Sequence, residues 1–95
     1  MALFVLICTD RPGAGAVRAA TREVHLAYID ALGEAVRLAG PMVGEDGETA
    51  GSLILVEAAD LAAARAIADA DPYGRAGVFA NVVVRSFRVS RGKLG

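Results

Sequence analysis

His25 is the only histidine of this chain. Histidine is the one side chain that ordinarily gains or loses a proton near neutral pH, which suits general acid or base catalysis. At 100° per residue, His25 falls at the edge of the apolar stripe of a predicted helix, next to Ile29 and Leu32. Arg18 and Arg22 lie on the neighbouring polar side. This half-buried position fits either proton transfer or a boundary histidine that packs its ring and hydrates one nitrogen.

Asp71 is the second candidate for chemistry, and it lies directly before Pro72. A residue before proline is displaced from the helical region, so Asp71 ends the preceding helix and is held in a rigid loop. A carboxylate in that place is more than a helical surface charge. Aspartate before proline is also common in plain turns, however. Both interpretations stay open on these residues alone.

The other candidate groups lack the sequence context that their chemistry requires. No G-x-S-x-G nucleophile elbow surrounds Ser52. Cys8 is the single cysteine and lies in an apolar run, which predicts a small buried hydrophobe rather than a nucleophile. Gly13 and Gly15 precede a helix without the full dinucleotide or P-loop fingerprint. One histidine with scattered acids matches no standard zinc or iron spacing, so we expect no metal and no cofactor.

Length, composition and charge indicate a single-domain protein that forms an oligomer and does not bind nucleic acid. With 95 residues, the chain is expected to form one domain over residues 1–95. Its apolar fraction of 55% is more than a small domain easily buries, which favours an oligomer. The formal net charge is -1, and acids and bases are interspersed, so we expect no nucleic-acid partner.

The sequence also favours a cytoplasmic location. The single cysteine excludes an intramolecular disulfide framework and fits a reducing compartment. The apolar run Ala2–Cys8 has no preceding Lys or Arg and is far shorter than the roughly 20 residues of a membrane span. We therefore interpret it as a strand and expect no membrane association.

The apolar pattern predicts six elements in the order β-α-β-β-α-β. Continuous apolar runs indicate strands, apolar residues at three- and four-residue steps indicate helices, and Gly, Pro and Asp mark the turns. The predicted elements are a strand at Ala2–Thr9, a helix at Val17–Leu38 stopped by Gly40-Pro41, a terse strand at Pro41–Val43, a strand at Gly51–Glu57, a helix at Leu61–Ala70 capped by Asp60, and a strand at Asn81–Ser90. We also expect a hairpin turn at Gly44–Glu48, a loop or short helical turn at Tyr73–Ala80, a bulge near Arg85-Ser86 and a tail at Arg91–Gly95.

This order predicts an α+β, ferredoxin-like βαββαβ sandwich, in which both helices cover one face of an antiparallel sheet. The other face is left bare. The segments Leu3–Cys8 and Leu53–Val56 are apolar at every position, so the bare face also needs a cover. A second copy of the same sheet is the simplest one, which predicts a homodimer through the sheet faces.

Several segments together resemble the YCII-related domain family. The resemblance covers nearly the whole chain and is carried by Arg22-Glu23-Val24-His25-Leu26, Ala39-Gly40-Pro41, Gly51-Ser52, Asp71-Pro72-Tyr73, Ala76-Gly77-Val78-Phe79 and Val82-Val83-Val84. The most specific parts are the histidine on the first helix and the Asp-Pro-Tyr after the second. The resemblance implies a ferredoxin-like domain of the dimeric α/β barrel type.

The resemblance also implies a catalytic dyad formed by His25 and Asp71. An aspartate that accepts from one imidazole nitrogen fixes the tautomer and raises the basicity of the other nitrogen. Ser52 and Tyr73 would then orient a substrate or stabilise a developing oxyanion, and Arg22 would hold an anionic group. Proton abstraction with elimination or isomerisation is the chemistry that such a site favours, as in small lyases and dehydrochlorinases.

Two functions from different classes remain at this point. In one, the chain is an enzyme acting on a small organic acid, lactone or phenolic ring in a cleft near the dimer interface. In the other, it is a non-catalytic dimeric ligand-binding or accessory domain, and the histidine and aspartate merely tie a loop to a helix. A concave pocket with an open imidazole nitrogen would favour the enzyme. A cofactor-free oxygenase of the dimeric α/β barrel type fits less well, because the chain has no tryptophan.

Overall fold

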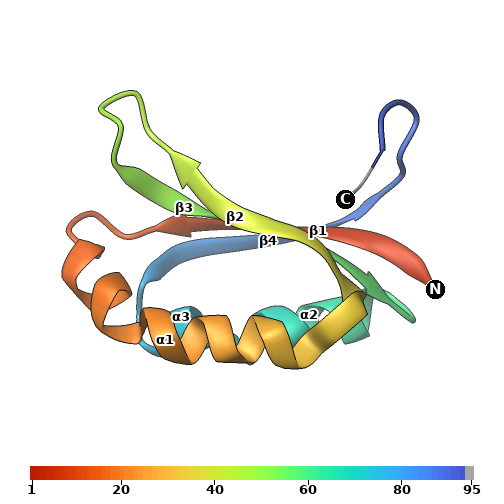
Figure 1. Ribbon diagram of the computed structural model, residues 1–95, viewed down its shortest axis with the longest axis horizontal. Coiled ribbons are helices and arrows are strands. Elements are labelled where there is room, and N and C mark those ends of the chain that lie inside the picture. The colour runs from red at the N-terminus through yellow and green to blue at the C-terminus, as the bar shows by residue number, and fades with distance from the viewer. Residues whose placement is uncertain (94–95) are drawn as a thin grey trace.

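One four-stranded antiparallel sheet carries the helices on a single face (Figure 1). The computed structural model describes residues 1–93. In chain order the elements are β1 (Ala2–Asp10), α1 (Gly15–Leu32), the 3₁₀ turn η1 (Gly33–Ala35), β2 (Val36–Val43), β3 (Thr49–Ala58), α2 (Leu61–Asp69), α3 (Pro72–Arg75) and β4 (Phe79–Phe87). The strand order is β2-β3-β1-β4, and the predicted α+β, ferredoxin-like fold is confirmed.

Alternate residues of the central strand β1 build the core beneath the helices. Phe4, Leu6 and Cys8 are buried on the helix-covered face. Leu6 is paired with Ile54 of β3 and with Val84 of β4, which are buried as well. Because successive side chains of a strand point to opposite faces, this register fixes which residues of each strand reach the helices.

The opposite face of the sheet is apolar and has no cover among residues 1–93 (Figure 1). On β1 it presents Leu3, Val5 and Ile7, which are only partly buried. Their cross-strand neighbours on this face include Leu53, Leu55, Val83 and Phe87. Within the described part of the chain, none of the helices combines the length and apolar character that a membrane crossing requires.

The first helix is shorter than the predicted Val17–Leu38. It ends at Leu32 because Gly33 has φ 60°, a left-handed conformation that residues with a Cβ rarely adopt. Gly40-Pro41 does not stop the helix but lies inside β2. This strand is eight residues long, whereas the predicted strand covers only Pro41–Val43. As β2 is an edge strand, the missing N–H of proline is tolerated there.

The last strand also differs from the prediction. It spans Phe79–Phe87 instead of Asn81–Ser90. No bulge lies at Arg85-Ser86, because β4 keeps a regular register with β1 there, and the register instead shifts between Thr9 and Asp10. Of the predicted tail Arg91–Gly95, the last two residues lie outside the described residues.

Two aspartates begin the two short helices. Asp60 caps α2 as predicted, since its Oδ1 accepts a hydrogen bond from the Ala63 N–H at 2.8 Å. Asp71 caps α3, a short helix that overlaps the segment predicted as a loop or short helical turn, and accepts from the Tyr73 N–H at 2.9 Å. Pro72 occupies the first position of α3, where its fixed φ suits a helix start.

Candidate functional site

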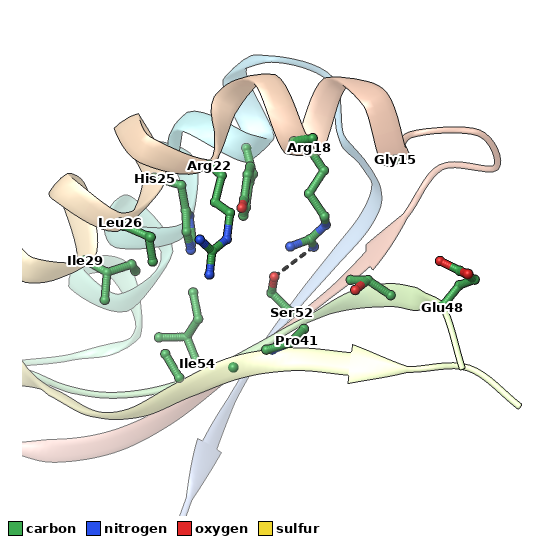
Figure 2. Close-up of a pocket in the computed structure, with 15 residues that line it drawn as sticks. Gly15, Arg18, Arg22, His25, Leu26, Ile29, Pro41, Glu48, Ser52 and Ile54 are labelled. Carbon is green, nitrogen blue, oxygen red and sulfur yellow. Dashed lines mark hydrogen bonds between the residues drawn. The ribbon is translucent and has the colours of Figure 1, made fainter. Parts of the chain in front are cut away.

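A cavity of about 660 Å³ lies between α1 and the strands β2 and β3, on the helix-covered side of the sheet (Figure 2). Its polar lining includes Arg18, Arg22, His25, Glu48, Ser52 and Tyr73, and its apolar lining includes Leu26, Ile29, Pro41 and Ile54. A cavity of this size with a mostly apolar wall and a few convergent polar groups is typical of a small-molecule site.

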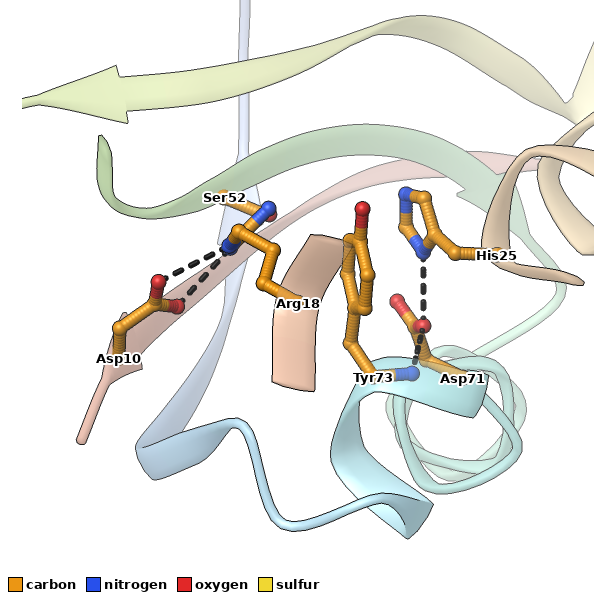
Figure 3. Close-up of polar contacts among 6 residues, drawn as sticks. All are labelled: Asp10, Arg18, His25, Ser52, Asp71 and Tyr73. Atoms are coloured by element: carbon orange, nitrogen blue, oxygen red, sulfur yellow. Dashed lines mark hydrogen bonds and ion pairs between the residues drawn. The ribbon is translucent and has the colours of Figure 1, made fainter. Parts of the chain in front are cut away.

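His25 and Asp71 meet at the inner wall of this cavity. Nδ1 of His25 lies 2.8 Å from Oδ1 of Asp71, although 46 residues separate them in the chain. The carboxylate is an acceptor, so this contact assigns the proton of a neutral imidazole to Nδ1 and leaves the lone pair on Nε2. Figure 3 shows Nε2 on the side of the ring that faces away from Asp71. The nitrogen suited to act as a base is therefore the one that does not touch the aspartate.

Both members of this pair are more enclosed than the sequence indicates. His25 is only 8% exposed, so the predicted half-buried position is wrong. Asp71 is buried, and its Oδ1 accepts from both the His25 ring and the Tyr73 N–H. Its Oδ2 is buried with no hydrogen-bond partner among residues 1–93. A carboxylate held by two donors on one oxygen is oriented rigidly toward the imidazole.

Tyr73 links the imidazole to an arginine. Its ring is stacked on that of His25, with centroids 3.9 Å apart and 15° between the planes. On the ring of Tyr73 lies the Arg18 guanidinium, with its central carbon 4.4 Å from the centroid. Guanidinium, phenol and imidazole thus form one continuous stack along the cavity (Figure 3).

Arg18 itself is fixed by an acid and a hydroxyl. Its Nε and Nη2 donate to the two carboxylate oxygens of Asp10, both at 2.9 Å, and Nη2 also donates to Oγ of Ser52 at 2.9 Å. Burial alone would lower the pKa of Arg18, but hydrogen bonding and charge from Asp10, together with Tyr73, raise this pKa above its ordinary value. The guanidinium therefore stays charged, and Asp10 neutralises it.

The residues predicted for the site come together in one place. His25, Arg22, Ser52 and Tyr73 all line the cavity, and Asp71 lies behind His25. Arg22 is exposed on the cavity side of α1 and makes no ion pair among residues 1–93, so its charge is available to a ligand. Ser52 is buried and already accepts from an arginine, which leaves it less free than expected.

Sequence reasoning missed the role of Arg18 and Asp10. Arg18, Arg22 and His25 recur at steps of four and three residues, so they share one helix face, and this spacing was the available signal. Nothing in the sequence pairs Arg18 with Asp10, which lies just beyond the predicted strand Ala2–Thr9. The ion pair forms because β1 continues to Asp10 and points this carboxylate at the start of α1.

Neither a metal centre nor a reactive thiol is present among residues 1–93. No cluster of three or more histidine, cysteine or acidic side chains is arranged to bind a metal ion in that part of the chain. Burial, with a smaller effect from the charge of Asp71, raises the pKa of Cys8 to about 12. The thiol therefore stays protonated at neutral pH and is a poor nucleophile.

Comparison with known proteins identifies the family. The model of the YCII-related domain matches residues 2–88, and the chain belongs to this family. Protein YciI of Escherichia coli O6:H1 is 37% identical over 94 residues, which span 90% of this chain and 96% of that protein. An uncharacterized protein of Haemophilus influenzae is 37% identical over 93 residues, 90% of this chain and 95% of its own length.

Two solved structures share the fold. The 5-chloro-2-hydroxyhydroquinone dehydrochlorinase TftG of Burkholderia phenoliruptrix AC1100, in complex with 2,5-dihydroxybenzoquinone, superposes with a TM-score of 0.83. It is 31% identical, and the match covers 90% of this chain and 93% of that one. The Arabidopsis thaliana protein At3g17210 has a TM-score of 0.51 and 13% identity, over 99% of this chain and 100% of its own, which shows a common fold alone.

Proposed function

We propose that this chain is a cofactor-independent enzyme in which His25 and Asp71 transfer a proton during elimination or isomerisation of a small organic molecule. The observation that carries the proposal is the 2.8 Å contact between Nδ1 and Oδ1, made by a histidine that lines a cavity of about 660 Å³. The similarity to a dehydrochlorinase that binds a dihydroxybenzoquinone supports the same class of chemistry.

In this mechanism, Nε2 of His25 removes a proton from the bound substrate. The electron pair of the broken bond moves into the substrate and expels a leaving group such as chloride, so that the elements of HCl are lost in total. Asp71 stabilises the imidazolium that forms, because its carboxylate lies directly against the Nδ1 proton. In an elimination the proton then passes from Nε2 to solvent. In an isomerisation no group leaves, and the proton returns to a different atom of the same molecule. Either step regenerates the base.

Three further side chains bind and orient the substrate in the proposed site. Arg22 brings an unneutralised positive charge to the cavity and suits a phenolate or carboxylate. The hydroxyls of Tyr73 and Ser52 face the same space and stabilise negative charge that develops on an oxygen. The apolar wall, which includes Leu26 and Ile54, favours a flat ring over a polar chain. A chlorinated phenolic compound has both a flat ring and an oxygen that can carry negative charge. Small lactones and hydroxy acids have only some of these features.

The functional unit in this proposal is a homodimer formed through the uncovered sheet face. Leu3, Val5 and Ile7, with apolar neighbours on β3 and β4, make that face too apolar to remain in water. A second copy buries the same surface on both chains, and the two copies then form an isologous interface.

A panel of small lactones, chlorinated phenols and hydroxy acids tests the proposed activity. Chloride release and product formation are measured for the wild type, for His25→Gln and for the exposed control Glu23→Gln, which lies on the same helix. We expect turnover of at least one class by the wild type and the control, and a loss of at least about 100-fold in His25→Gln. Turnover unchanged in folded His25→Gln would exclude the proposed base, and saturable binding without turnover by the wild type would favour a ligand-binding domain.

A further inference from the structure

Two oppositely charged segments project from the sheet on its uncovered side. The acidic tip is the β2–β3 turn, residues 44–48, with charged side chains Glu45, Asp46 and Glu48. The basic arm is residues 88–93, after β4, with charged side chains Arg88, Arg91 and Lys93. Figure 1 shows that both extend away from the helices, at opposite ends of the sheet.

The charges of these two segments are not used within the described chain. Among residues 1–93 the ion pairs are Arg18–Asp10 and Arg37–Glu57, and His25 contacts Asp71, so none of these contacts involves the acidic tip or the basic arm. All six charged side chains are exposed. The tip has a fixed shape, because Gly44 N–H donates to the Glu48 carbonyl at 2.8 Å and Glu48 N–H donates to Asp46 Oδ1 at 3.0 Å.

A second copy on the uncovered face meets these projections in one of two ways. A two-fold axis along the viewing direction of Figure 1 inverts the copy end for end and places its arm beside the acidic tip of the first chain. A horizontal two-fold axis in the plane of that view instead places tip against tip and arm against arm. The second arrangement brings like charges together on both sides, which is unfavourable.

We propose that the acidic tip of each chain binds the basic arm of a second copy, and that this pairing sets the orientation of the dimer. The inference rests on the proposed homodimer and adds to it the two-fold axis and the charged contacts. Apolar contacts on the sheet face provide the affinity, whereas the two tip–arm contacts exclude the inverted packing.

The pairing also brings the second copy to the proposed active site. Glu48 belongs to the acidic tip and at the same time lines the cavity. In this pairing the arm of the partner subunit lies beside the tip that carries Glu48, and its positive charge adds at longer range to that of Arg22 in attracting an anionic substrate.

Dimer dissociation constants of charge-reversed chains, measured by analytical ultracentrifugation, test this pairing. The tip variant is Glu45→Lys with Glu48→Lys, and the arm variant is Arg88→Glu with Arg91→Glu. The swap variant carries all four changes, and Glu23→Lys with Asp30→Lys on the exposed face of α1 is the matched control. We expect the tip and arm variants each to weaken the dimer by at least about tenfold at low salt, and the swap variant to return within about threefold of the wild type.

The salt dependence of the dimer dissociation constant shows whether the tip–arm contact is attractive or repulsive. For the wild type we expect weaker dimerisation as salt is raised, and the control variant is expected to behave like the wild type. A wild-type dimer that is insensitive to all four reversals, or that becomes tighter with salt, would overturn the tip–arm pairing while leaving the sheet-face dimer intact. A wild-type chain that stays monomeric at high protein concentration would overturn both.

Discussion

The His25 imidazole is stacked face to face on the Tyr73 ring, with their centroids 3.9 Å apart. Tyr73 thereby holds the imidazole from one side while Asp71 holds it through Nδ1. The Tyr73 ring also meets Phe79 edge-on, at a centroid distance of 6.1 Å, so the stack is continuous with the core. The position of the proposed base is therefore built into the packing of the domain.

Two substitutions of Tyr73 separate the structural role of its stacked ring from the role of its hydroxyl. Tyr73→Ala is expected to lower the free energy of unfolding by about 3–5 kcal/mol, because it removes a buried ring. Tyr73→Phe keeps both ring contacts and is expected to cost less than about 1 kcal/mol. Urea unfolding measures both. Equal losses in the two variants would show that the hydroxyl, rather than the stack, stabilises this part of the domain.

The partly buried ion pair between Arg18 and Asp10 is expected to be strongly coupled. The two side chains are 13% and 8% exposed, so Arg18→Gln leaves a nearly buried carboxylate unpaired at a cost of about 3–5 kcal/mol. Asp10→Asn in the same chain relieves part of that cost. A double-mutant cycle is therefore expected to give a coupling energy above about 1 kcal/mol.

The pair Arg37–Glu57 provides an internal control for this cycle. Its side chains are 38% and 34% exposed, and the corresponding coupling is expected to be below about 1 kcal/mol. Similar coupling energies for the two pairs would contradict the view that burial makes the Arg18–Asp10 pair important.

Gly51 is required by the close approach of β3 to β1. A Cβ at this position would overlap the carbonyl oxygen of Cys8 and the end of Met42. We expect Gly51→Ala to lower the free energy of unfolding by at least about 2 kcal/mol. Gly40→Ala on the adjacent strand is the matched control, because a Cβ there meets nothing within 4 Å. Thermal and urea unfolding compare the two, and a Gly51→Ala variant as stable as Gly40→Ala would contradict the register described for this sheet.

The raised pKa of the buried Cys8 thiol predicts how the free energy of unfolding changes at alkaline pH. Burial raises the pKa of Cys8 from 9.0 to about 12, so the folded chain keeps this proton where the unfolded chain loses it. The free energy of unfolding therefore falls between pH 9 and about 12, with a slope that approaches about 1.4 kcal/mol per pH unit. Well below pH 9 the thiol is protonated in both states and contributes almost no slope.

Replacing the thiol isolates this effect. Between pH 8 and pH 10.5 the wild type is expected to lose about 2 kcal/mol more than Cys8→Ala, in urea titrations at both pH values. Parallel losses in the two chains would mean that the thiol ionises as readily in the folded state as in the unfolded one.

The apolar pattern predicted the class and order of the main elements but not every boundary. β1 and β3 are long apolar runs, and their placement needed no tertiary information. The predicted first helix extends past Gly33 because Ala35 and Leu38 continue its apolar spacing, and only the backbone shows that Gly33 has φ 60°. The spacing of a sequence does not report such a conformation.

The sequence predicts only part of the proposed site, because some of its contacts depend on the three-dimensional fold. His25 and Asp71 are candidates from residue type and position alone, whereas only the resemblance to a family predicts that they act as a pair, and the fold places them in contact. Arg18 was noted only as a neighbour of His25 on the helix, because its partners Asp10 and Ser52 come from two different strands. Contacts between such distant segments are set by strand register, which local patterns do not encode.

The central claim is that Asp71 makes His25 an effective base, and the kinetics of Asp71→Asn on the best substrate of the panel test it most directly. The asparagine keeps the size of the side chain and its acceptor oxygen but removes the charge that stabilises the imidazolium. With folding verified by thermal unfolding, we expect kcat/KM to fall by about 10²–10⁴-fold, mainly through kcat. A kcat/KM within about threefold of the wild type in folded Asp71→Asn would contradict the account.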